Sequence, residues 1–219
     1  MNIRVTILLL ASALALGGCI SLKSYVDPTY AKSGYEDLIK PAQATALKVT
    51  VEFSRNGTRL PRADDELRGH VERVLRGSGL VAPSDTSVNG EMLVAVDNVG
   101  DVGKAAAKGF GTGLTFGLAG STVEDGYVMT VTLATNGKTV TKSGYRHVLI
   151  STVGNQKGPE GLAPTTAAAG FGTIVEQMLL NALRDLQKDG LLVRAADQVP
   201  FREAMVSVVV IGQWGKQIC

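Results

Sequence analysis

The order of predicted elements indicates an α+β fold. We expect a two-layer sandwich in which a mostly antiparallel sheet of about four strands carries two helices on one face. Three observations predict this fold. Apolar and polar residues alternate over several short segments, as in half-buried strands, and two longer segments space their apolar residues as a helix does. An Asn-Gly pair between two alternating runs is typical of a β-hairpin.

The first half of the domain predicts a strand, a helix and a second strand. Residues 47–53 alternate apolar and polar side chains and lead into a turn at Asn56-Gly57. Three acidic residues then open a helix at Asp64, where the helix dipole favours negative charge, and glycines end it by Gly79. Residues 92–96 alternate again and predict the second strand.

The second half predicts a hairpin. Residues 127–133 and 139–152 form its two strands, and Asn136-Gly137 forms its turn. Gly144 interrupts the return strand, as a residue at a β-bulge does.

The longest predicted helix follows a loop rich in glycine and proline. Thr165 or Thr166 caps its start, and a basic last turn with Gly190 ends it. One side of this helix is apolar and the other is polar. We therefore expect it to pack on the sheet and not to span a membrane.

The N-terminus has the order of a secretory signal. Arg4 supplies a positive start, residues 7–16 are apolar, and Leu16-Gly17-Gly18-Cys19 follows. The apolar run is shorter than the roughly 20 residues that span a bilayer. Its last four residues resemble the lipobox of bacterial lipoproteins.

This resemblance implies a lipid anchor. In the family, the chain is cut before the cysteine, here between Gly18 and Cys19, and the Cys19 sulfur and amino group carry acyl chains. Two or more chains give stable anchoring. Ile20 stands where an aspartate would favour the inner membrane, so the resemblance favours the outer membrane, with the domain on the periplasmic face. The alternative is an ordinary signal peptide in which Cys19 occurs by chance.

These features divide the chain into four parts. Residues 1–18 are the signal peptide and residues 19–46 a lipidated tether. The tyrosines of the tether either dock onto the domain, which we favour, or sit at the lipid interface near the acyl chains. Residues 47–192 are the α+β domain, with a glycine-rich insert at 103–121. Residues 193–219 are a C-terminal extension, whose apolar run predicts either a further edge strand or a tail that covers the sheet.

The glycine-rich insert has no phosphate-binding template, because it contains neither G-x-G-x-x-G nor a P-loop. Gly109 begins its apolar part, and Gly113 and Gly117 form a small-xxx-small pair that lets another backbone approach closely. Three interpretations remain open at this point: a turn packed on the domain, a surface for self-association, or a segment in contact with the membrane.

A second resemblance involves the same region. Gly113-Leu-Thr-Phe-Gly-Leu118, then Asp125-Gly-Tyr127 and the strand to Leu133, resemble a glycine-leucine core of poorly characterised Gram-negative lipoproteins. The resemblance spans residues 105–190, and its motif supplies no catalytic residue. The predicted layout is also similar to that of small α/β lipoproteins that assist outer-membrane assembly, which is an analogy of fold alone.

The sequence predicts no catalytic, metal or cofactor site. His70 and His147 lack metal ligands at short spacing, so we expect ordinary surface or edge residues. An enzyme would need His147, Arg146 and an acidic group clustered in a pocket. The chain has 22 basic and 20 acidic residues, a balance without the basic excess of a nucleic-acid-binding protein. A lipidated Cys19 could not form a disulfide with Cys219.

The predicted function is therefore a lipid-anchored envelope lipoprotein that faces the periplasm and has no catalytic activity. We expect a binding or assembly accessory whose partners are the membrane, through its lipid, and an envelope protein. The alternative is a structural protein that self-associates or contacts the membrane through residues 109–120.

Overall fold

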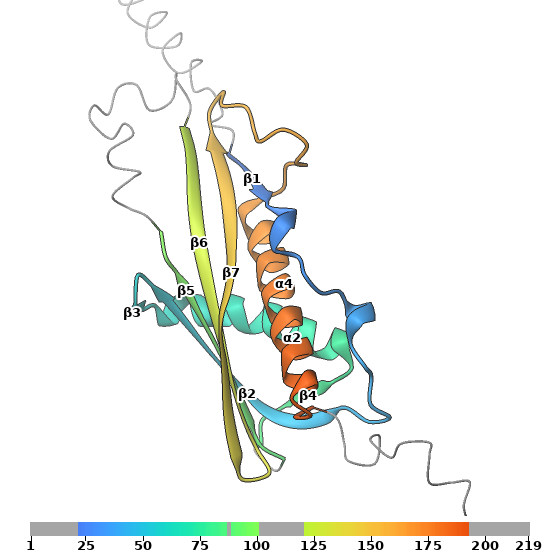
Figure 1. The fold of residues 1–219 in the computed structure, drawn as a ribbon. Helices are drawn as coiled ribbons and strands as arrows, with labels where there is room; N and C mark the ends of the chain where they lie inside the picture. The colour runs from blue at the N-terminus through green and yellow to red at the C-terminus, as the bar shows by residue number, and fades with distance from the viewer. Residues whose placement is uncertain (1–21, 87–88, 101–120, 193–219) are drawn as a thin grey trace, which may run out of the picture.

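The computed structural model describes residues 22–86, 89–100 and 121–192. In these residues, seven strands form one mixed sheet with the order β1-β7-β6-β5-β2-β3, and β4 pairs with β2 (Figure 1). The strands are β1 (Leu22–Val26), β2 (Thr45–Arg55), β3 (Thr58–Arg59), β4 (Val81–Ser84), β5 (Glu91–Asn98), β6 (Ser121–Thr135) and β7 (Lys138–Val153). The α-helices are α2 (Asp64–Ser78) and α4 (Ala167–Lys188), and short 3-10 helices occupy Pro28–Tyr30, Tyr35–Asp37 and Pro61–Ala63.

The predicted two-layer sandwich with about four mostly antiparallel strands is wrong, although the fold remains α+β. The sheet is mixed because α2 returns the chain to the starting end of β2, so that β4 and β5 both run parallel to β2. Three strands have no counterpart in the prediction. β1, β3 and β4 contain five, two and four residues, too few for a clear alternating pattern.

One apolar core lies between the helices and the sheet face toward which they pack. Alternate residues of β2, β5 and β6 enter this core, and so do the apolar stripes of α2 and α4. The side chains with essentially no exposure include Leu47, Leu67, Leu75, Leu80, Met92, Met129, Leu133, Ile174, Leu179, Leu183 and Leu186. On the opposite sheet face, the alternating residues of β2, Lys48, Thr50 and Glu52, are half-buried or exposed.

The predicted turns are confirmed. Asn56 and Gly57 both have positive φ and join β2 to β3, and Asn136 and Gly137 do the same between β6 and β7. This is the geometry that makes Asn-Gly a hairpin signal. The register between β6 and β7 shifts opposite Gly144, whose φ is +84°, so the predicted bulge is also present.

The helix boundaries also follow their sequence signals. α2 begins with the three acidic residues from Asp64 and ends at Gly79, which adopts the left-handed conformation at φ +70°. The Thr166 side chain caps α4 by accepting the Ala169 N–H. Gly190 follows α4 at φ +72°.

The segment that follows Cys19 is folded onto the domain from Leu22 onward, where the sequence predicts a tether. β1 pairs antiparallel with β7 from Leu22↔Val153 to Val26↔Leu149. Residues 27–40, which we call the strap, then run along α4. Tyr25 is buried and Tyr35 packs against the core, so these two tyrosines do contact the domain.

We predict that Gly90→Ala destabilises the domain. Gly90 precedes β5 at φ +130°, and a Cβ there would lie 2.2 Å from the Ala134 carbonyl oxygen. A strained backbone and an overpacked contact together cost about 3 kcal/mol. Chemical denaturation would measure the loss.

Gly69→Ala is the matched control, because Gly69 lies in α2 and a Cβ there meets nothing within 4 Å. It should raise the free energy of unfolding by about 0.5–1 kcal/mol. Equal effects of the two substitutions would contradict the prediction.

Candidate functional site

The residues predicted to carry function lie outside the described residues. They are Gly18 and Cys19 at the cleavage and lipidation site, and Gly109, Gly113 and Gly117 in the glycine-rich insert. The structure does describe the residues next to both regions. Leu22 follows Cys19 by three positions, and Ser121 ends the insert.

These two boundary residues lie at the same end of the sheet. Leu22 pairs with Val153 on one side of β7, and Ser121 pairs with Val153 on the other side. Leu22, Val153 and Ser121 therefore form one row across the adjacent strands β1, β7 and β6, which lie side by side in Figure 1. Neighbouring strands are about 4.8 Å apart, which places Leu22 and Ser121 roughly 10 Å from each other. We call this row the anchor end of the sheet, after the anchor that the sequence predicts at Cys19.

β1 is held firmly at the anchor end. Ser24 is fully buried, and its hydroxyl lies 3.0 Å from the Ser151 hydroxyl of β7. The Ser24 backbone also exchanges two hydrogen bonds with Thr165, on the side of β1 that faces away from β7. The Tyr25 ring packs so closely on Gly158 that a Cβ at that glycine would collide with it. The first strand is thus paired with β7 along one edge and bonded to Thr165 at Ser24 on the other.

Polar side chains of α4 hold the strap. Asn181 Nδ2 donates to the Tyr30 carbonyl at 3.3 Å, and Arg184 Nη1 donates to the Lys32 carbonyl at 3.0 Å. Gln187 exchanges two hydrogen bonds with the Ile39 backbone. These three side chains recur every third residue, so they lie along one edge of the helix.

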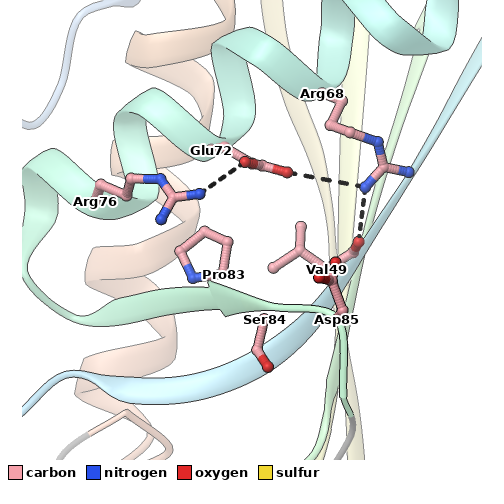
Figure 2. Close-up of a pocket in the computed structure, with 7 residues that line it drawn as sticks. All are labelled: Val49, Arg68, Glu72, Arg76, Pro83, Ser84 and Asp85. Carbon is pink, nitrogen blue, oxygen red and sulfur yellow. Dashed lines mark hydrogen bonds and ion pairs between the residues drawn. The ribbon is translucent and has the colours of Figure 1, made fainter.

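A small polar hollow of about 130 Å³ lies between α2 and the strands β2 and β4 (Figure 2). Glu72 lies between two arginines of α2, 2.9 Å from Arg76 and 4.0 Å from Arg68. Arg68 Nη1 also donates to the Val49 carbonyl at 3.0 Å. The remaining lining residues are Pro83, Ser84 and Asp85.

The hollow lies at an interruption in the sheet edge. Lys48 pairs with Glu91 of β5 on one side and with Ser84 of β4 on the other. β3 pairs with β2 only at Ser54 and Arg55, so residues 49–53 have no strand partner on that side within the described structure. Side chains of α2 replace the missing strand: Arg68 bonds the Val49 carbonyl, and Asp64 accepts the Phe53 N–H.

The charges of the hollow are largely satisfied within it. Arg68 and Arg76 both form ion pairs with Glu72, and Arg68 also donates to the Val49 carbonyl. Such a set lacks the unpaired cations that recognise phosphate or carboxylate ligands. Its role is therefore to close the edge of β2, which would otherwise offer backbone groups to another chain.

His147 is buried, with 1% of its surface exposed, and the prediction of a surface or edge residue is wrong. Its Nδ1 accepts the Val148 N–H at 2.8 Å, so Nε2 carries the proton that is donated to the Gln177 side-chain oxygen. The Tyr30 ring lies 4.9 Å away. β1 ends at Val26, which pairs with Leu149 of β7. The next residue of β7 past this pair is Val148, and its N–H, which has no partner in β1, bonds to the imidazole.

The structure does not bring His147 together with Arg146. The two residues are neighbours in β7, so their side chains leave opposite faces of the sheet, and Arg146 is exposed while His147 is buried. His147 thus has a structural environment of a backbone amide, a glutamine and a tyrosine ring.

His70 lies at the seam between α2 and α4. Its ring packs edge-on against Phe171 at 5.6 Å, and Gly172 provides the space for it. Burial and the neighbouring Arg73 lower the pKa of His70. Phe171 also contacts the Tyr127 ring at 5.5 Å, and burial raises the pKa of Tyr127 to about 12. Both groups are uncharged at neutral pH in this aromatic cluster.

The described residues contain no group of three or more His, Cys, Asp or Glu side chains arranged to hold a metal ion. Within residues 22–86, 89–100 and 121–192, no helix combines the length and apolar character that crossing a membrane would require.

Sequence reasoning missed the α4 side chains that bond the strap and the α2 side chains that close the edge of β2. Asn181, Arg184 and Gln187 occur on the polar side of a predicted helix, where such residues usually meet water. Their i, i+3, i+6 spacing is the one available signal. Arg68 gives no signal, because its partner is a backbone carbonyl.

We predict that Arg68→Met destabilises the domain more than Arg76→Met does. The first change leaves the partly buried Val49 carbonyl without its donor, at a cost of about 1 kcal/mol. The second removes only an exposed ion pair, which is worth less than about 0.5 kcal/mol. Urea denaturation of both variants would measure the difference, and equal losses would show that Arg68 does not close the edge.

Comparisons with known proteins identify no family. No family model matches the sequence, and no curated protein matches it. Among solved structures, a PelC variant dodecamer from Paraburkholderia phytofirmans is 14% identical and matches 80% of this chain and 98% of its own, with a TM-score of 0.33. A crystal structure of an uncharacterised protein is 10% identical and matches 69% of this chain and 94% of its own, with a TM-score of 0.26. At these scores the likeness carries no argument about fold or function.

Proposed function

We propose that this chain is a lipid-anchored lipoprotein on the periplasmic face of the outer membrane, where it acts as a non-catalytic binding or assembly accessory. The proposal rests on the lipobox-like Leu16-Gly17-Gly18-Cys19. The observation that supports it most is the position of β1, which begins three residues after Cys19 and is bonded into the sheet at once. A chain held by its first residue gains from a first strand that cannot fray.

The short link defines how the domain is held. Only Ile20 and Ser21 separate Cys19 from Leu22. Three residue steps span at most about 10 Å of extended chain. An acylated Cys19 would therefore keep the anchor end close to the bilayer, without a long spacer.

The sheet face opposite the helices supports a binding role. Thr50, Leu93, Thr132 and Thr141 form a row across β2, β5, β6 and β7, and all four side chains are half-buried or exposed. This face carries threonine and leucine side chains, with charges such as the Lys48–Glu91 ion pair near one end. A mixed surface of this kind suits a protein partner in the envelope.

The test of the anchor is mass spectrometry of the mature protein. We expect cleavage before Cys19 and the added mass of acyl chains on that residue, with the protein in the outer-membrane fraction. Cys19→Ala should abolish both the acylation and the membrane fractionation, because no sulfur remains to carry the lipid.

Cys219→Ala is the control, since it removes the other cysteine and should leave acylation unchanged. Unmodified Cys19 in the mature protein, or cleavage at another position, would refute the anchor.

The glycine-rich insert supplies a second candidate function, self-association or membrane contact through residues 109–120. One observation favours it: the insert ends at Ser121, in the same row of the sheet as Leu22. Its C-terminal end therefore emerges beside the expected anchor. The pair Gly113 and Gly117 would allow close approach of another backbone.

We predict that Gly113→Leu with Gly117→Leu abolishes oligomers in detergent while the domain stays folded, because leucine side chains would hold the backbones apart. Analytical ultracentrifugation would measure the association, and circular dichroism the fold. Gly69→Leu, at an exposed helical position with open space around it, is the control. A wild-type protein that is monomeric in detergent would remove self-association as a function.

A further inference from the structure

We propose that the anchor end of the sheet is a membrane-contacting surface, with Leu22 in the headgroup layer and the β6–β7 hairpin directed away from the bilayer. This inference rests on the proposed lipidation of Cys19. It adds what the anchor alone does not specify, namely which face of the domain meets the lipid and how the domain is oriented.

The reach of the chain limits where the bilayer can lie. Leu22 is at most about 10 Å from Cys19 along the backbone. The headgroup regions account for roughly 5–7 Å on each side of the hydrocarbon core. A sulfur that carries diacylglycerol is positioned at this boundary, so Leu22 must lie within or directly above the headgroups.

The chemistry of this end suits a lipid surface. Leu22 is 56% exposed, so its large apolar side chain is free to enter a lipid surface. Lys23 in β1 and Glu124 in β6 are exposed close to this end, and Lys157 and Glu160 are exposed in the loop that follows β7, so these charges balance. The contact therefore depends on the acyl anchor and on the apolar Leu22, and it does not require anionic lipid.

Because β1 is rigidly attached to the sheet, fixing β1 at the bilayer also fixes the orientation of the whole domain relative to the bilayer. β1 is bonded to β7 on one side and to Thr165 on the other, so it cannot swivel as a free linker would. β6 contains 15 residues and runs from Ser121 to Thr135, next to the hairpin turn (Figure 1). At about 3.3 Å per residue, the turn lies roughly 45 Å from the anchor end. Lys138, the first residue of β7, marks that far end.

Depth-dependent fluorescence quenching tests the proposal. The acylated full-length chain would carry Cys219→Ser and one new cysteine, at Lys157→Cys or Lys138→Cys, labelled with a fluorophore. Each protein would be reconstituted into phosphatidylcholine vesicles that contain a lipid with a nitroxide on its headgroup. We expect quenching at least about fivefold stronger at position 157 than at 138, because the two positions differ by most of the length of the hairpin.

Two substitutions probe the apolar contact. Leu22→Glu should reduce the quenching at position 157 by about half, because the domain end lifts from the headgroups when a charge replaces the apolar side chain. Ile39→Glu is the matched control: Ile39 is 68% exposed but lies on the strap next to Gln187 of α4, away from the anchor end. It should leave the quenching unchanged.

Mass spectrometry of every preparation distinguishes failure of the proposed lipidation from failure of the proposed orientation. If Cys19 lacks acyl mass, the proposed function fails and this inference fails with it. If Cys19 is acylated and the two labels are quenched equally, or position 138 more strongly, only the orientation is overturned. A Leu22→Glu protein that is quenched like the wild type would remove Leu22 from the contact.

Discussion

The domain depends on burying a single apolar sheet face beneath α2 and α4. Because only one face is covered, every strand must present its apolar residues on the same side, which fixes the register throughout the sheet. The same demand explains the crossover through α2. The helix can cover β2 and β5 only by running back along them, so the two strands become parallel.

Residues 22–40 belong to this arrangement, since they pack against the sheet and α4. Ser24, Tyr25 and Leu38 are buried, and α4 bonds the strap at three points along one edge. At the interrupted edge of β2, polar side chains likewise bond to the backbone, and Arg68 and Asp64 take the place of a neighbouring strand. In both places, side chains of a helix satisfy backbone groups that a sheet partner does not reach.

Much of the fold was predictable from local signals. The two Asn-Gly turns, the bulge at Gly144, the Thr166 cap and both helices follow from residue type and spacing, which act over a few residues. The strand count and the parallel pairs were not, because β1, β3 and β4 are short and their pairing is decided by distant partners. His147 was misjudged for the same reason: its burial depends on Tyr30 and Gln177, which are far away in the sequence. For the candidate site, a sequence motif predicts the lipidation residue. That Leu22 and Ser121 lie in one row follows only from the strand register, which the sequence does not reveal.

The direction in which β1 enters the sheet has a mechanical consequence. A lipid attached just before Leu22 would draw on this strand along its own axis, so a load between membrane and domain would act as shear across the pairing of β1 with β7. Bonds loaded in shear share the force and must break together, whereas bonds at the end of a peeled strand break one after another. The buried Ser24, bonded on both of its edges, lies in the middle of that joint. An anchor at Cys19, as proposed above, would therefore pull against a strand whose bonds to β7 resist tension together.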